Sequence, residues 1–61
     1  MMILVFAFPS GHQISKDVEG FTPDSIALVA KGRLMAEQDG FIPTGRASVD
    51  LHTKSVVIYC E

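Results

Sequence analysis

The stretch FTPDSIALVAKGRLMAEQDGF, residues 21–41, contains the clearest folding signals in the sequence. Thr22 is a favoured N-cap residue, Pro23 suits the first helical position, and Asp24 brings a negative charge to the positive end of a helix dipole. The Asp-Gly pair near the end of the stretch supplies a stop, because glycine readily adopts the left-handed conformation that ends many helices. The sequence therefore predicts one helix from Pro23 to about Gln38.

The apolar positions of this helix form two stripes instead of one. One stripe surrounds Gly32 and is expected to face a sheet. Glycine in a helix interior costs about 1 kcal/mol relative to alanine, so its presence indicates a close backbone approach, with a neutral substitution as the alternative. The second stripe, formed by Ile26, Ala30 and Leu34, has no predicted cover within the chain.

Strand patterns lie on both sides of the helix. Residues 2–8 form a short apolar run, rich in β-branched and aromatic side chains, that stops at a Pro-Ser-Gly turn. Residues 46–51 alternate between apolar and polar, whereas residues 55–60 are apolar on both faces, as in a strand covered on both sides. Residues 10–20 are polar and predict a loop, with a short irregular strand as the alternative.

These elements predict an α+β fold. The order β-α-β-β, with a right-handed crossover and a terminal hairpin, is a split β-α-β unit. It gives a three-stranded, mainly antiparallel sheet in the order 1-3-2, with the helix packed on one face. The chain has 61 residues, of which 48% are hydrophobic, so residues 1–61 are expected to form a single small domain with one core.

One helix covers one face of such a sheet, so the other face is expected to stay open. Each large apolar side chain left in water loses about 1.5 to 3 kcal/mol of the free energy that its burial would contribute. For several side chains, this is a large share of the stability of a small domain. A second copy, by sheet stacking or by edge pairing of the first or second strand, a partner protein, or the loop of residues 10–20 could cover that face. That face is expected to present Leu4, Phe6 and Phe8, or the opposite side chains of that strand, with Val57 and Tyr59. The predicted contact residues are Leu4, Phe6, Phe8, Val57 and Tyr59, followed by Ile26, Ala30 and Leu34.

Few residues suggest chemistry. His12, His52 and Cys60 stand at none of the spacings that typify metal sites, so neither a metal nor a cofactor is expected. Asp50 and His52 could form an acid–imidazole pair, but a solvated turn explains them more simply. Cys60 belongs to an apolar strand, where an inert buried thiol is the usual finding. The sequence therefore predicts a protein that is not an enzyme.

The composition of the chain indicates in which compartment it works and which partners it binds. Charged residues make up 20% of the chain and the formal net charge is −2, which argues against a protein that mainly neutralises phosphates. A single cysteine and the lack of a long apolar run predict a cytoplasmic protein with no membrane span. For a nucleic-acid site, the hairpin residues Arg46, Ser48 and Lys54 are the candidates.

The first hypothesis is thus a small cytoplasmic interaction or regulatory module without catalytic activity, acting as a homodimer or on a partner protein. Separate chains of this size are often accessory factors of phages and mobile elements, which is an association and not a property of these residues. The alternative is a dimeric regulator that binds nucleic acid through its hairpin.

Overall fold

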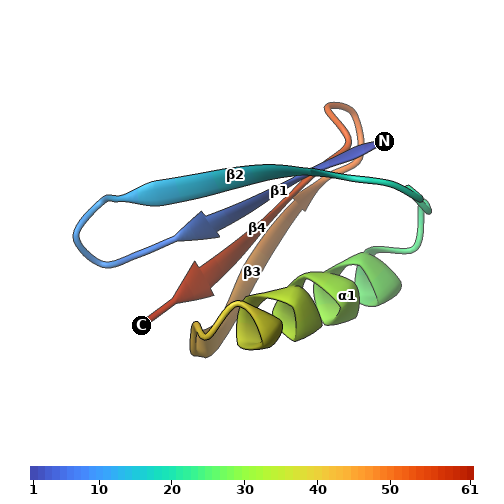
Figure 1. Ribbon diagram of the computed structural model, residues 1–61. Coiled ribbons are helices and arrows are strands. Elements are labelled where there is room, and N and C mark those ends of the chain that lie inside the picture. The colour runs from blue at the N-terminus through green and yellow to red at the C-terminus, as the bar shows by residue number, and fades with distance from the viewer.

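A computed structural model describes residues 1–61 as one mixed sheet with one helix on one of its faces (Figure 1). Along the chain, the elements are β1 (Met2–Ala7), β2 (Gln13–Val18), α1 (Ser25–Gln38), β3 (Pro43–Asp50) and β4 (Ser55–Cys60). The four strands lie in the order β2-β1-β4-β3. The two central strands, β1 and β4, run parallel, and each pairs antiparallel with an edge strand.

The predicted α+β class with one helix is confirmed, but the predicted three-stranded sheet is wrong. β4 lies between β1 and β3, so the predicted strands keep their predicted order. The polar stretch read as a loop contains the additional strand β2, which pairs with β1 from Met2↔Val18 to Ala7↔Gln13. Because β1 is thereby paired on both sides, it is not an edge strand. The sheet is mixed, and β2 extends its edge instead of folding over the open face.

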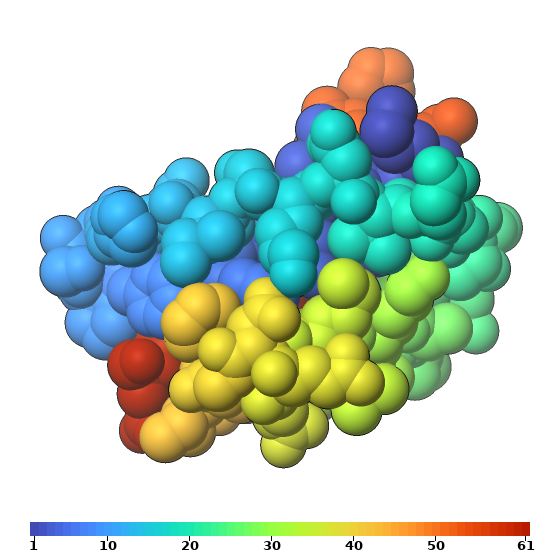
Figure 2. Space-filling model, in the orientation of Figure 1, coloured from blue at the N-terminus to red at the C-terminus, as the bar shows by residue number.

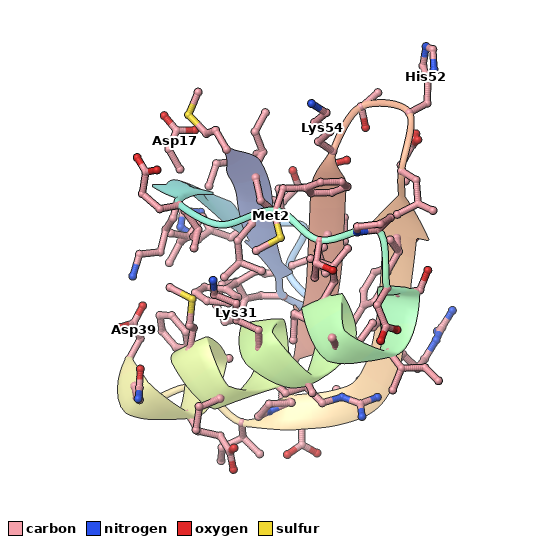
Figure 3. The ribbon with its side chains drawn as sticks, turned by 90° about the vertical axis from the view of Figure 1, so that its right-hand side faces the viewer. Met2, Asp17, Lys31, Asp39, His52 and Lys54 are labelled. Atoms are coloured by element: carbon pink, nitrogen blue, oxygen red, sulfur yellow. The ribbon has the colours of Figure 1, made fainter.

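The core lies between the sheet and α1. Its fully buried or nearly fully buried members come from alternate positions of the two central strands and from the inner side of the helix: Met2, Leu4, Phe6, Val56, Ile58, Cys60, Leu28 and Ala36. Figure 3 shows Met2 in the layer between β1 and the helix. A Cβ atom added to Gly32 would lie 2.8 Å from Cγ1 of Ile58 and 3.1 Å from Cδ1 of Leu4. Gly32 thus lets the helix approach the sheet closely, as its position in the sequence indicates.

The helix begins later than predicted. Asp24 is the N-cap, and its Oδ1 accepts hydrogen bonds from the backbone N–H groups of Ile26 at 3.0 Å and Ala27 at 3.4 Å. Thr22 and Pro23 therefore lie outside the helix. Aspartate is the stronger choice at this position, because one carboxylate both accepts the free N–H groups and complements the helix dipole.

The predicted stop after the helix is confirmed. Gly40 has a φ of +87°, in the left-handed region that favours glycine. The N–H of Phe41 donates to the carbonyl of Ala36 at 2.9 Å, and the N–H of Gly40 donates to that of Glu37 at 3.1 Å. This pair of bonds is a Schellman motif, which turns the chain directly from α1 into β3.

Candidate interaction surface

The side of the sheet that faces away from α1, here called the open face, is the candidate site. The register of the strands arranges its side chains in three rows, each read across β2, β1, β4 and β3. The first row is Asp17, Ile3, Ser55 and Asp50, the second is Ser15, Val5, Val57 and Ser48, and the third is Gln13, Ala7, Tyr59 and Arg46.

The centre of the open face is apolar. Ile3 is 43% exposed and Tyr59 is 37% exposed, while Val5 and Val57 between them are half-buried. Polar side chains of the two edge strands border this patch on both sides. An apolar centre with a polar rim is the usual anatomy of a protein-binding surface.

Charge is divided between the two ends of the open face. Asp17 and Asp50 stand in the first row, whereas Arg46 stands in the third, with its guanidinium carbon 5.4 Å from the ring centroid of Tyr59. The Oδ1 atom of Asp50 accepts hydrogen bonds from the backbone N–H groups of His52 at 2.9 Å and Thr53 at 3.2 Å. Its Oδ2 atom has no hydrogen bond within the chain and is free to accept one from outside.

A shallow hollow of about 280 Å³ opens at the arginine end, where β1 and β4 finish. The small side chain of Ala7 forms part of its wall, and the rest is lined by Phe8, Pro9, Thr44, Arg46, Tyr59 and Cys60. Ile3, at the other end of β1, projects from the same face. The open face therefore has a projection at one end and a depression at the other.

The structure corrects the predicted contact residues of the first strand. Leu4 and Phe6 are 0% exposed and belong to the core under α1, and Phe8 is half-buried with its ring 5.1 Å from that of Phe41. Gly32 lets the helix approach this side of β1 closely, since a Cβ atom there would lie 3.1 Å from Cδ1 of Leu4. Of the two alternatives for this strand, the opposite set, Ile3, Val5 and Ala7, lies on the open face beside Val57 and Tyr59.

Both edge strands carry features that discourage pairing with another strand. On β2, Lys16 reaches over the edge, and its Nζ forms an ion pair with Oδ2 of Asp39 at 2.8 Å. Figure 2 shows the side chains of β2 meeting those of α1 along this edge. On β3, the register shifts between Pro43 and Ala47, and Gly45 there has a φ of +96°. Neither edge is therefore well suited to pairing with another strand.

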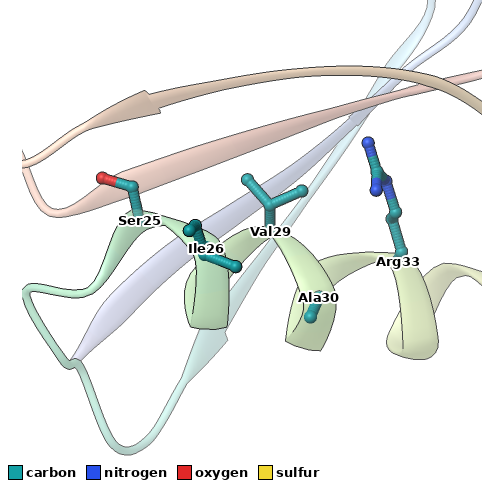
Figure 4. A pocket seen from close by; sticks show the side chains of 5 residues that line it. All are labelled: Ser25, Ile26, Val29, Ala30 and Arg33. Carbon is teal, nitrogen blue, oxygen red and sulfur yellow. The ribbon is translucent and has the colours of Figure 1, made fainter.

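The second predicted stripe lies on the outer side of α1. Ile26 is 83% exposed and Leu34 is 56% exposed, with Ala30 exposed between them. A hollow of about 370 Å³ lies beside this stripe, lined by Ser25, Ile26, Val29, Ala30 and Arg33 (Figure 4). Arg33 is already engaged, since its guanidinium donates to the carbonyl of Gly45 at 2.7 Å. This surface is separate from the open face.

The three candidate residues for nucleic acid are not gathered into one basic surface. Arg46 and Ser48 lie on the open face, whereas Lys54 lies in the turn between β3 and β4, with its Nζ 5.7 Å from the ring centroid of Phe21. The carboxylate of Asp50 lies between them along the hairpin. Phosphate binding needs clustered positive charge, and this arrangement interleaves the two signs.

The groups capable of chemistry are dispersed. His52 projects from the turn between β3 and β4 (Figure 3), and the carboxylate beside it, that of Asp50, bonds the backbone of the turn instead of the imidazole. Burial raises the pKa of the Cys60 thiol, which favours the unreactive protonated form. No three potential metal-ligating side chains come together, and α1 is too short and too polar to cross a bilayer.

Comparisons with family models, with curated proteins and with solved structures give no match to this sequence or this fold. The open face is therefore interpreted from its own geometry.

Proposed function

We propose that this chain is a protein-interaction module without catalytic chemistry, and that it works as a homodimer whose interface is the open face. The observation that carries the proposal is the exposed apolar centre of that face, with opposite charges at its two ends. Burying such a centre in a second copy removes apolar surface from water, at about 25 cal/mol for each Å². Self-association is a common remedy for a small domain whose single helix leaves one sheet face bare.

The proposed role rests on the surfaces that the dimer leaves exposed to other proteins. A dimer of two small domains has its two outer helices, each with the stripe of Ile26, Ala30 and Leu34, available to further proteins. We propose a regulatory or accessory role of this kind in the cytoplasm, which suits a chain with one unpaired, buried cysteine. The nucleic-acid alternative has less support, because the open face carries more acidic than basic residues.

The solution mass tests the proposal directly. Light scattering after gel filtration, over a concentration series, is expected to show a mass rising from 6.6 kDa toward twice that value. Tyr59 offers a second readout, because the chain has one tyrosine and no tryptophan. Its fluorescence should become protected from acrylamide quenching over the same range of concentration.

A matched pair of variants locates the interface. Val57→Lys places a charge at the centre of the open face and is expected to give a monomer. His52→Lys adds the same charge in the exposed turn and is expected to dimerise like the natural chain. A natural chain that stays monomeric at every concentration, or a Val57→Lys variant that still dimerises, would contradict the proposal.

A further inference from the structure

We infer that the two copies bind in one specific register, with their strands antiparallel across the interface and Arg46 of each chain paired with Asp50 of the partner subunit. This inference rests on the proposed function, since it specifies how the second copy sits on the open face. It is carried by the distribution of charge and size over the rows of that face.

The register follows from a two-fold axis that crosses the strands at the middle row. Such an axis keeps every strand over its own copy but reverses the order of the rows, so the first row of one chain faces the third row of the other. Val5 and Val57 then meet their own copies at the centre. Sheets packed in the aligned arrangement keep their strand directions within about 30° of each other, so this pairing of rows survives their twist.

Charge favours this register. Asp50 and Arg46 both belong to β3, one in the first row and one in the third, so each dimer contains their ion pair twice. The free Oδ2 atom of Asp50 is the acceptor that the arginine needs. On β2, the same operation brings Asp17 opposite the amide of Gln13.

The competing register is disfavoured by charge. An axis parallel to the strands keeps each row but exchanges the strands, so Asp50 of β3 faces Asp17 of β2. That contact also occurs twice, and both times it brings carboxylates together. Juxtaposed like charges penalise the wrong arrangement of an interface more than well-placed opposite charges strengthen the right one.

Shape favours the same choice. In the antiparallel register, Ile3, which is 43% exposed, faces Ala7, which is only 8% exposed and borders the hollow of about 280 Å³. The projection of each chain thus enters the depression of the other. The hydroxyl of Tyr59 likewise faces the small side chain of Ser55, with which it can exchange a hydrogen bond.

The size of the face sets the strength of the dimer. Four strands about 4.8 Å apart, with about 3.3 Å per residue along six residues, cover about 400 Å² on each chain. Specific interfaces of this size lie at the weak end of the known range. We therefore expect a dimer that dissociates on dilution, and one in which two ion pairs decide the register.

Charge exchange between two variants tests the register. Arg46→Asp alone and Asp50→Arg alone each place like charges at both contacts, so each variant is expected to dimerise at least about tenfold more weakly than the natural chain. In an equimolar mixture, a heterodimer joins an arginine to an aspartate at both contacts. Native mass spectrometry should then show the heterodimer in excess over both homodimers, and light scattering should show the dimer mass restored.

A second pair of variants tests the register without changing charge. Ala7→Ile crowds two isoleucines at each contact and Ile3→Ala leaves two alanines, while their mixture restores one of each. Asp50 accepts two backbone hydrogen bonds in its turn, so Asp50→Arg could fail to fold, which circular dichroism would reveal. In that case, the pair Ala7→Ile and Ile3→Ala still tests the register.

The outcomes separate the inference from the proposed function. Recovery of the dimer in both mixtures supports the register. If the natural chain dimerises and Val57→Lys abolishes the dimer, but the variants of each pair dimerise as well alone as mixed, the register is wrong and the proposed function stands. A natural chain that is monomeric throughout overturns both.

Discussion

The two sides of β1 are equally apolar in sequence but differ in the shape of their side chains. Toward the helix, β1 presents Met2, Leu4 and Phe6, which are 0% exposed. Away from it, the same strand presents the β-branched Ile3 and Val5 and the small Ala7. Long side chains fill the depth between a sheet and a helix, whereas a flatter surface suits a sheet that packs on another sheet. This difference is what we expect if the open face packs on a second sheet, as proposed above.

The largest expected effect comes from truncating matched positions on the two faces. Phe6→Ala opens a cavity in the core and is expected to cost about 3 to 5 kcal/mol of the free energy of unfolding. That loss is enough to unfold much of a domain of this size. Val5→Ala, one residue away on the open face, is expected to cost about 1 kcal/mol or less in the dilute monomer, because Val5 is only half-buried there.

Urea denaturation followed by circular dichroism, at a concentration where the chain is monomeric, measures both values. The comparison of the two faces fails if Val5→Ala is as destabilising as Phe6→Ala. That result would mean that the open face is covered within the monomer.

A smaller effect is expected where the helix approaches the sheet. Gly32→Val forces side-chain atoms into the space occupied by Ile58 and Leu4, and overpacking of this kind costs about 1 to 3 kcal/mol. Ala30→Val introduces the same side chain on the outer side of the helix, where only the lower helix propensity of valine acts, at about 0.5 kcal/mol. Equal midpoints in urea for the two variants would show that the helix stands further from the sheet than described.

The sequence predicts much of this architecture, because most elements carry local signals. The helix and its glycine stop, the hairpin of β3 and β4, and the order of these strands beside β1 all follow from periodicity and turn residues. The sequence places the start of the helix too early, because Thr22 and Asp24 are both good N-caps and only the backbone path selects Asp24.

The sequence predicts β2 only as the alternative to a loop in residues 10–20, because the inner face of this strand is interrupted by a charge. Ile14 and Val18 face the helix side of the sheet, but Lys16 stands between them and hides the alternation. The ammonium group of Lys16 forms an ion pair with Asp39, a residue distant in sequence, and so avoids the apolar layer between the sheet and the helix. A contact of that kind is a tertiary feature, and no local pattern encodes it.

The open face itself could be predicted only in part. Periodicity requires one apolar side of β1 to be uncovered but does not say which, since both sides are equally hydrophobic in sequence. The helix covers the side of Leu4, which would lie 3.1 Å from a Cβ atom at Gly32, and this contact is a tertiary feature. The charged corners of the face depend on strand register, which the sequence does not specify locally.

The smallest expected effect concerns the thiol on the covered face. Burial raises the pKa of Cys60 above its ordinary value of 9.0, so the folded protein holds the thiol neutral at a pH where the unfolded chain ionises it. The stabilisation linked to this neutral thiol is complete below about pH 9 and is lost as the pH rises through that value toward the higher pKa of the folded state. The stability difference between the natural chain and Cys60→Ala should therefore shrink above pH 9, whereas an unchanged difference from pH 7 to 11 would contradict it.

Thiol labelling extends this test to the other face. In the Cys60→Ala background, Val57→Cys places a thiol at the centre of the open face, where a water-soluble maleimide should modify it rapidly in dilute solution and slowly at concentrations that favour the dimer. The natural thiol at Cys60, which is 2% exposed, should react slowly at both concentrations, because only opening of the core exposes it. Protection that depends on concentration at one face and not at the other would distinguish an intermolecular cover from an intramolecular one.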